Sequence, residues 1–299
     1  MKGLATAALA LAVASASTAA FADDPAYDAF SRGAYLTALQ EAEKAAAAGQ
    51  VTANTLIGEI YAKGLGVPQN FSRAAVAYEK AAAQDANAQL ALALLLAEGK
   101  GVPKNPKRAA DLFEKAAAAG LSAAQYNLAL IYVEGRVRPE SAERAAELLG
   151  KAAAQGHAQA QYDLGALYSL GRGVPLDPAM AAQWIERAAR QGLAAAEVEF
   201  AIMLFNGKWT EKDIPRSVTL LRSAAAKGNP VAQNRLARLY AAGVGVERDL
   251  LEAAKWHILS REAGVSDFQL DMVLGALSEA QRRAAEIAAD EWARRGMRR

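Results

Sequence analysis

Apolar and polar positions alternate with a helical period along most of the chain. In residues 161–168 and again in residues 181–189, apolar side chains recur at steps of three and four residues, which is the spacing of an amphipathic helix. A loop containing glycine and proline, residues 171–175, lies between the two segments. Glycine supplies the left-handed backbone conformation that ends a helix, and proline cannot continue one. The pattern therefore predicts a helix, a loop and a second helix.

This unit recurs with a nearly constant period. Successive helix-ending positions are 36, 35, 36, 36, 36 and 36 residues apart, at Gly49, Asp85, Gly120, Gly156, Gly192, Gly228 and Gly264. We expect six units, at residues 50–85, 86–120, 121–156, 157–192, 193–228 and 229–264. Because one helix pair cannot bury its apolar face alone, such units stack on one another. The predicted fold is an all-α, right-handed α-solenoid of six to seven helix-loop-helix repeats.

One position in the first helix of every unit holds a small residue. Its six members are Gly58, Ala93, Ala129, Gly165, Ala201 and Ala237. Small side chains let neighbouring helices approach closely, and the larger apolar residue two positions later fills the interior. We expect this column to lie where helices are in tight contact.

The fourth unit carries the fullest version of the pattern. Residues 160–192 match A-x-x-x-L-G-x-x-Y, then G-x-G-V-x-x-D, then A-x-x-W-x-x-x-A-A-x-x-G. This arrangement resembles the Sel1-like repeat family, which is related to the tetratricopeptide repeats, and the other five units match it more loosely. The resemblance covers roughly three quarters of the chain. It implies a solenoid that binds other proteins, commonly along a groove lined by the first helices.

Three segments outside this regular pattern stand out. Residues 23–49 form an incomplete unit, which predicts capping helices that cover the first repeat. The loop of the third unit contains residues 136–139, Arg-Val-Arg-Pro, and that of the fifth contains residues 208–215 in place of the usual glycine and valine. We expect these two loops to depart from the regular repeat.

The C-terminal segment, residues 265–299, predicts a degenerate first helix followed by a capping helix. Ser278 and Gln281 have the spacing of a capping box, in which each residue satisfies a backbone N–H of the other at a helix start. Ile287 and Trp292 are the large apolar residues of this last helix. We expect both to pack back on the preceding repeat.

The first 22 residues have the organisation of a secretory signal peptide. Lys2 supplies a basic start, residues 4–13 form a short apolar run, and a small-x-small site ends at Ala22. The run is shorter than a bilayer span requires. We expect cleavage after Ala22 and a periplasmic mature chain, with full secretion as the alternative. No later segment is long and apolar enough to span a membrane.

Composition removes several classes of chemistry. The chain has no cysteine, which excludes disulfides, thiol catalysis and thiolate metal sites. The formal charge of +2 gives no footprint for nucleic acid. The two histidines, His157 and His257, lie nearly three units apart and are interpreted as packing residues. No serine has a nucleophile context with a base in reach. We therefore expect no catalytic residue, metal or cofactor.

Candidate binding residues are those that the repeat does not constrain. Two columns of the first helix, one on each side of the small residue, vary freely among units. From these columns we single out Asn127, Asp163, Glu199, Arg235 and Arg238 as hypothesised contacts of a groove. A solvated helix face is the alternative interpretation. Trp209 lies in the irregular fifth loop, either tucked beneath it or exposed as an anchor for a partner.

These observations favour a monomeric, non-enzymatic scaffold or adaptor of the bacterial cell envelope. The family resemblance implies that it regulates a membrane signalling or envelope-assembly protein held in the groove. One alternative is an envelope hydrolase or penicillin-binding activity, which has been credited to cysteine-rich relatives, although this chain has no cysteine. Another is a secreted effector that binds host proteins.

Overall fold

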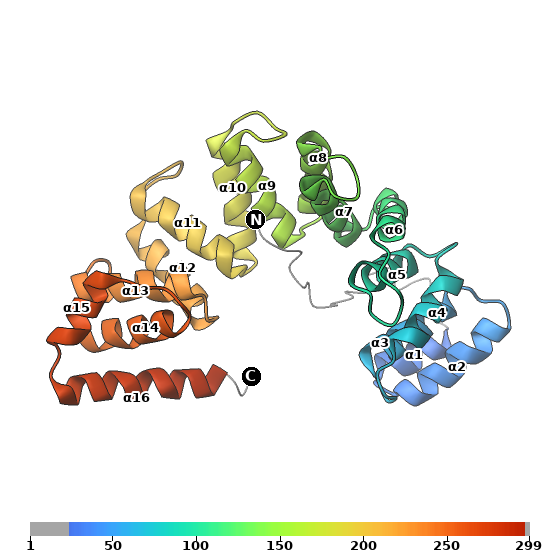
Figure 1. The fold of residues 1–299 in the computed structure, drawn as a ribbon, viewed down its shortest axis with the longest axis horizontal. Helices are drawn as coiled ribbons and strands as arrows, with labels where there is room; N and C mark the ends of the chain where they lie inside the picture. Colours follow the sequence, from blue (N-terminus) through green and yellow to red (C-terminus); the bar gives the residue numbers. More distant parts are fainter. Residues whose placement is uncertain (1–23, 297–299) are drawn as a thin grey trace. The chain divides into compact units, whose positions relative to one another are not determined.

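The computed structural model describes residues 24–296, and all of its regular structure there is helical (Figure 1). This confirms the predicted all-α fold class. The predicted leader and its cleavage site after Ala22 lie outside the described residues. The chain divides into two compact units, one ending at His157 and the other beginning at Ala158.

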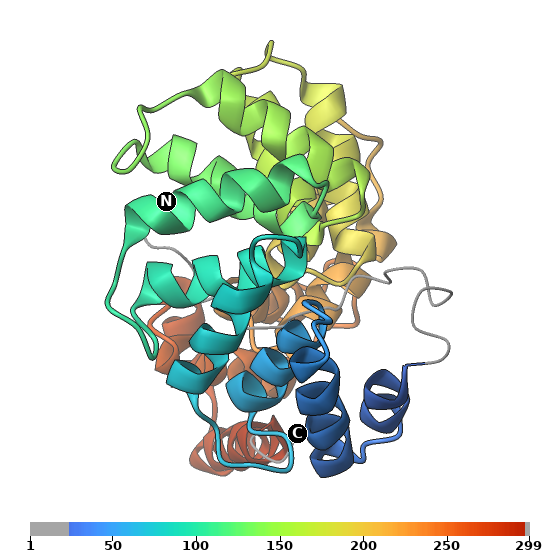
Figure 2. The ribbon, with the colours of Figure 1, turned by 90° about the vertical axis from the view of Figure 1, so that its right-hand side faces the viewer.

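The first unit contains four pairs of helices. They are α1 (Pro25–Ser31), α2 (Tyr35–Ala47), α3 (Ala53–Lys63), α4 (Phe71–Ala81), α5 (Ala86–Glu98), α6 (Pro106–Ala118), α7 (Ser122–Glu134) and α8 (Ala142–Ala154). The pair α1 and α2 forms the predicted N-terminal cap, and these dark-blue helices pack beside the first repeat (Figure 2).

The second unit contains the remaining eight helices of the described chain. They are α9 (Ala158–Leu170), α10 (Pro178–Arg190), α11 (Ala194–Asn206), α12 (Ile214–Ala226), α13 (Pro230–Ala242), α14 (Leu250–Glu262), α15 (Phe268–Ala276) and α16 (Glu279–Gly296). The first six form three further repeats, and α15 and α16 form the C-terminal end.

The same hydrogen bond closes the loop within each of the six repeats. In each repeat, the backbone N–H of the residue before the second helix donates to a carbonyl of the first helix over 2.8–3.1 Å. The six pairs are Asn70 with Tyr61, Asn105 with Leu96, Ser141 with Tyr132, Asp177 with Tyr168, Asp213 with Leu204, and Asp249 with Tyr240. The side chains of the same six donors cap the second helices. These residues prefer that position because their oxygens accept from otherwise unpaired N–H groups of the first turn.

The fifth loop keeps the regular backbone, so our expectation that it departs from the repeat is wrong for that loop. The third loop does depart: its Arg136 N–H makes no bond to the Ile131 carbonyl, and Val137 does not take the positive φ found at this position in the other five repeats.

Both loops also differ from the others in their side chains. Arg138 of the third loop forms ion pairs with Asp111 at 2.5 Å and Glu114 at 2.8 Å. In the fifth loop, Trp209 takes a left-handed backbone conformation with φ of 65°. The third loop therefore has an altered turn and the fifth a regular one, and the side chains of both add contacts.

The small column of the first helix lies at tight helix contacts, as expected. A Cβ placed on Gly58 would come within 2.5 Å of the Tyr78 ring, and one on Gly165 within 2.7 Å of Ile185. Both large partners are almost fully buried. Glycine thus stands where the second helix of the same repeat presents a large side chain.

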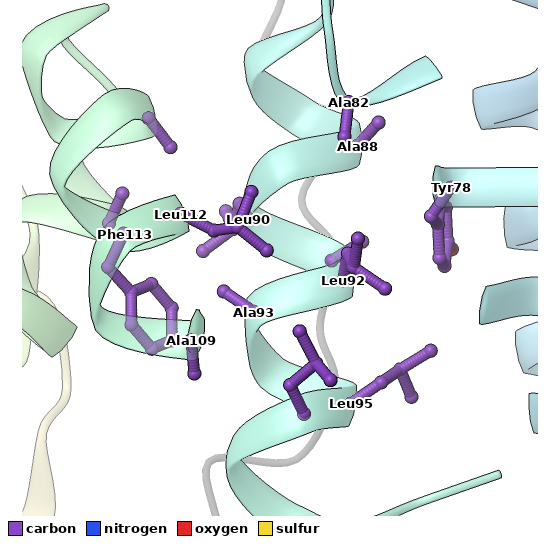
Figure 3. Packing of buried hydrophobic residues seen from close by; sticks show 14 of the residues in the cluster. Tyr78, Ala82, Ala88, Leu90, Leu92, Ala93, Leu95, Ala109, Leu112 and Phe113 are labelled. Carbon is purple, nitrogen blue, oxygen red and sulfur yellow. The ribbon is translucent and has the colours of Figure 1, made fainter. Parts of the chain in front are cut away.

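The core of the first unit runs continuously from repeat to repeat. Figure 3 shows Leu112 and Phe113 of α6 on one side of α5 and Tyr78 of α4 on the other. Ala93 of α5 lies on the side facing Phe113. Each first helix is therefore packed between two second helices, which buries the apolar surface that a single pair would expose.

The C-terminal helix α16 packs on α14. Its predicted capping box is confirmed, since the Ser278 N–H donates to Gln281 Oε1 at 3.0 Å and the Gln281 N–H donates to Ser278 Oγ at 3.3 Å. Trp292 packs edge-on against Trp256 with ring centroids 5.7 Å apart. The expectation that Ile287 also packs back is wrong, because its side chain is 52% exposed.

Candidate protein-binding site

Three charged residues occupy equivalent positions on the first helices of the second unit. Asp163 lies on α9, Glu199 on α11 and Arg235 on α13, each 36 residues from the next. Glu199 and Arg235 are exposed, and Asp163 is half-buried. Because equivalent residues of stacked repeats lie on one face, the three side chains form a row, which we call the charged row.

The N-terminal part of the charged row is acidic. Burial raises the pKa of Tyr162, and the negative charges of Glu199 and Asp163 raise it further. Both carboxylates are therefore close enough to Tyr162 to disfavour a second negative charge there. Asp163 also accepts a hydrogen bond from Gln159 Nε2 at 3.2 Å. Its carboxylate is thus partly committed within its own helix, whereas Glu199 remains exposed.

The C-terminal member of the row is basic, and it differs from Arg238, which lies three residues later on α13. Arg235 is exposed and forms no ion pair with any residue in the described range. Arg238 instead donates from Nε to Asp267 Oδ2 at 2.6 Å. Arg238 therefore holds the start of α15, while Arg235 is available to a partner.

Asp267 is a residue whose role the sequence analysis missed. Its carboxylate caps α15 at the Leu270 N–H and accepts a further bond from Asn234 Nδ2 at 2.9 Å. Burial alone would raise the pKa of this carboxyl, but the hydrogen bonds from Arg238, Asn234 and Leu270 lower it overall. Asp267 directly precedes the apolar segment that begins at Phe268, and aspartate is a preferred residue at the position before a helix. This position in the sequence could have indicated its role.

Trp209 is tucked against the protein. Its half-buried ring packs on the cluster that contains Phe200 and Met203, and Lys208 Nζ lies 4.3 Å from the ring centroid. This geometry matches the tucked alternative of the two considered for this residue. A positive φ at a bulky residue is costly, and the buried ring contacts offset that cost.

Asn127 lies in the first unit, on α7, so it is described apart from the charged row. Its side chain is half-buried, and Nδ2 donates to the carbonyl of Ala123 at 2.7 Å. One of its amide protons is thus used within its own helix, in contrast to the free guanidinium of Arg235.

A buried polar column between repeats was also missed. Glu197 is 3% exposed and accepts from Lys227 Nζ at 2.7 Å and from Ser223 Oγ at 2.8 Å. Four repeats place glutamine at the same position, at Gln89, Gln125, Gln161 and Gln233. The recurrence of a long polar side chain every 36 residues could have indicated this column. In these five repeats it links the first helix to the end of a neighbouring second helix.

The two histidines occupy separate packing sites. His157 stacks on Tyr126 with ring centroids 4.7 Å apart, and burial lowers the pKa of its imidazole. His257 is 1% exposed and lies 2.8 Å from Asp271 through Nε2. Among the residues that the structure describes, no group of three His, Asp or Glu side chains could hold a metal ion. Within residues 24–296, every helix is too short or too polar to cross a bilayer.

Comparison with protein families matches this repeat architecture. The model of the Sel1 repeat matches six consecutive segments, at residues 51–85, 86–121, 122–157, 158–193, 194–229 and 230–265. These segments cover most of the chain and follow the helix pairs from α3 to α14. A comparison with curated proteins gives no match.

Solved structures of similar repeat proteins share the fold. A Sel1 repeat protein from Oxalobacter formigenes is 27% identical, with a TM-score of 0.69 over 82% of this chain and 99% of that one. A protective antigen present in uropathogenic Escherichia coli strains, which displays an SLR fold, is 28% identical with a TM-score of 0.59. That alignment covers 86% of this chain and 64% of the antigen, so the chain spans less than two thirds of the antigen's length.

Proposed function

This chain belongs to the Sel1 repeat family, and from that premise we propose that it is a scaffold that binds a partner protein without catalysing a reaction. The observation that carries the proposal is the charged row of the second unit. Glu199 and Arg235 are exposed on successive first helices, and Arg235 has no ion-pair partner in the described range. Neither side chain is needed to close a repeat.

Rigid helices holding opposite charges at adjacent positions favour recognition of a partner with the complementary charge order. Such complementarity speeds encounter and selects partners more than it adds affinity. An acidic stretch around Asp163 and Glu199 followed by the cation of Arg235 fits a partner segment that carries a basic group and then an acidic group. Asn127, in the other unit, is proposed as a separate polar contact.

We further propose that the partner is a protein of the cell envelope. The sequence of residues 1–22 supports export, and no sulfur chemistry is required for folding there, because the chain has no cysteine. A membrane signalling protein or an envelope-assembly protein fits this compartment. The mature chain would then act as a regulator or adaptor of that protein in the periplasm.

The test is crosslinking in living cells followed by mass spectrometry of a tagged chain. The variant Glu199→Ala/Arg235→Ala should lose the dominant crosslinked envelope protein, because the charge order of the row is removed. The matched control is Arg282→Ala/Glu286→Ala on α16, which also removes one exposed cation and one exposed carboxylate. This control should retain the partner.

Unchanged crosslinking of the Glu199/Arg235 variant would contradict the charged row as the binding site. Recovery of the chain in the culture medium with a host protein would contradict the envelope role. Turnover of a β-lactam or of peptidoglycan by the purified chain would contradict a purely binding function.

A further inference from the structure

A cleft in the first unit is formed by helices that carry no residue of the charged row. It has a volume of about 580 Å³, its walls are α2 and α4, and its floor is α3. The lining residues on each helix follow steps of three and four residues. On the floor they are Asn54, Ile57 and Tyr61, and on the α4 wall they are Arg73, Val76 and Lys80. Each helix thus presents one continuous stripe. We call this cleft the N-terminal trough.

The trough is open because its floor is covered less than in the later repeats. Ile57 is half-buried. The residues at the same position in the other five repeats are at most 5% exposed: Leu92, Leu128, Leu164, Phe200 and Leu236. Besides Glu43, the helix α2 offers only Ala46 and Ala47 to this cleft. Apolar surface that the other repeats cover is therefore left accessible in the first repeat.

A hydrogen bond that joins neighbouring helix pairs in other repeats is missing between α3 and α2. In the second repeat, Gln89 Nε2 donates to the Ala82 carbonyl of the preceding second helix at 2.7 Å, and Gln125 and Gln233 make corresponding bonds in their repeats. The first repeat has Asn54, whose side chain is one methylene shorter, and its Nδ2 donates to Val51 of its own segment. No side-chain amide joins α3 to the end of α2 at this position.

An ion pair that joins other second helices is also not formed here. Arg108 pairs with Glu79 of the preceding second helix, and Arg216 pairs with Glu186 in the same way at 2.5 Å. The equivalent pair would be Arg73 with Glu43, on opposite walls of the trough. Arg73 Nη1 instead donates to Tyr61 Oη at 3.1 Å, and its guanidinium lies 5.3 Å from the Tyr61 ring centroid.

The exposed wall of α4 carries an apolar residue where other repeats are polar. Val76 is 60% exposed. Its counterparts are Asp111, Glu147, Gln183, Thr219 and Lys255. Arg73 and Lys80 flank Val76 on the same stripe, and Lys80 has no ion-pair partner within residues 24–296. With Glu43 on the opposite wall, the trough lining has two cations and one carboxylate around the apolar side chains of Ile57 and Val76.

We propose that the N-terminal trough is a second binding site, which takes a short segment of a partner protein. The segment places a bulky apolar side chain on Ile57 and Val76 and a carboxylate between Arg73 and Lys80. The excess of cations favours an acidic group, and the accessible side chains of Ile57 and Val76 favour an apolar one. The seven helical steps from Arg73 to Lys80 span about 10 Å along α4, which is the length of about three extended residues. The proposal does not depend on the charged row.

The test uses a phage-displayed library of random heptapeptides selected on the purified chain. A parallel selection uses Asn54→Gln/Val76→Asp, which gives the first repeat the residues that stand at these positions in other repeats. Peptides enriched on the unaltered chain should pair an aliphatic or aromatic residue with Asp or Glu within three positions. Synthetic copies should bind the repaired variant at least tenfold more weakly in fluorescence polarisation.

Two further variants test the contribution of the trough's positive charge and the independence of the trough from the charged row. Lys80→Glu changes one exposed side chain and should weaken the same peptides by at least fivefold, while replacing their acidic residue with glutamine should abolish the difference. Glu199→Ala/Arg235→Ala should leave peptide affinity unchanged, which separates this site from the charged row. Circular dichroism melting checks that each variant is folded.

The proposal is overturned if no peptide is enriched, if the enriched peptides lack an acidic residue, or if folded Lys80→Glu binds them as tightly as the unaltered chain does. Should the repaired variant fail to fold, Lys80→Glu alone decides between these outcomes.

Discussion

The terminal helices cover the apolar faces of the first and last repeats to different extents. At each end, a helix that is not part of a complete repeat must cover an apolar face. At the C-terminal end, α16 packs on α14 through Trp292 and Trp256, with Ala285 and Ala289 buried beside them. At the N-terminal end, α2 presents Ala46 and Ala47 to the trough and leaves it open.

The difference lies in side-chain size at the end of α2, because its buried Leu39 packs nearer the start of the helix and the apolar residues at the trough are alanines. A tryptophan spans the gap between two helices and buries a large area, whereas alanine reaches little beyond the backbone. Stability is therefore expected to be concentrated in the closed C-terminal end, and accessible binding surface in the open N-terminal one.

The largest predicted effect breaks the closed end. Trp292→Ala should lower the free energy of unfolding by about 3 kcal/mol, because it removes the ring that packs on Trp256 and leaves a cavity. Urea denaturation followed by circular dichroism measures it. The matched control is Ile287→Ala on the same helix, which is expected to change stability by less than about 0.5 kcal/mol because the side chain is 52% exposed. Equal losses for the two variants would contradict the closed-end description.

The next prediction asks whether the open end has a loose interior. Gly58→Ala should cost about 2 kcal/mol, because its Cβ would lie 2.5 Å from the Tyr78 ring. Adding Tyr78→Leu should recover part of this loss, since it recreates the alanine and leucine pairing of Ala129 and Leu149. Gly150→Ala, which meets no atom within 4 Å, should instead stabilise the chain by up to about 1 kcal/mol. A neutral Gly58→Ala would mean that the first repeat is loosely packed.

A smaller effect compares two arginines of α13. Arg238→Ala should lower stability by about 1 kcal/mol, because it leaves the carboxylate of Asp267 buried with one partner fewer. Arg235→Ala should change stability by less than about 0.5 kcal/mol, since its side chain is exposed and forms no ion pair in the described range. Thermal melting of both variants provides the measurement.

The same pair has a defined pH dependence. The folded pKa of Asp267 lies below its ordinary value, so its stabilisation is fully present above a pH of about 4 and is lost as the pH falls through the folded pKa. Arg238→Ala should reduce this acid sensitivity. An unchanged acid transition would show that the ion pair does not set it.

The smallest predicted effect concerns the open end. Val76→Asp should change stability by less than about 0.5 kcal/mol, because Val76 is 60% exposed and a carboxylate stands at the same position in the second repeat. Its control is Ala77→Asp on the same helix, which should be strongly destabilising because Ala77 is buried. A large loss with Val76→Asp would indicate that the trough is filled in the folded chain.

The repeat could be predicted from sequence because its determinants are local. Glycines that end first helices, capping residues such as Asn70 and Asp213, and the small column each act within a few residues or within one unit. The same locality made the capping box of Ser278 and Gln281 visible. A period of 36 residues then places every helix without knowledge of distant contacts.

Contacts between repeats, and between the last repeat and the C-terminal helices, were harder to predict. Ile287 is apolar, but the buried stripe of α16 runs through Ala285, Ala289 and Trp292, so size alone misplaced it. The partner of Arg238 lies 29 residues away in the degenerate last segment. The N-terminal trough arises because Asn54 makes no hydrogen bond to α2 and Val76 is apolar where its counterparts are polar. Neither difference could be recognised as part of a cleft until the positions of the helices were known.

The small-to-large contact between helices has a consequence for how such a chain can grow. Gly58 and Tyr78, like Gly165 and Ile185, belong to one repeat and are 20 residues apart. A gene segment that encodes one repeat therefore carries both halves of this contact. Duplicating or exchanging that segment leaves the internal fit intact, and only the surface between neighbouring repeats has to adapt. Adding whole repeats therefore leaves this contact undisturbed. Replacing the glycine by a larger residue, by contrast, requires a smaller residue at its partner position in the same repeat.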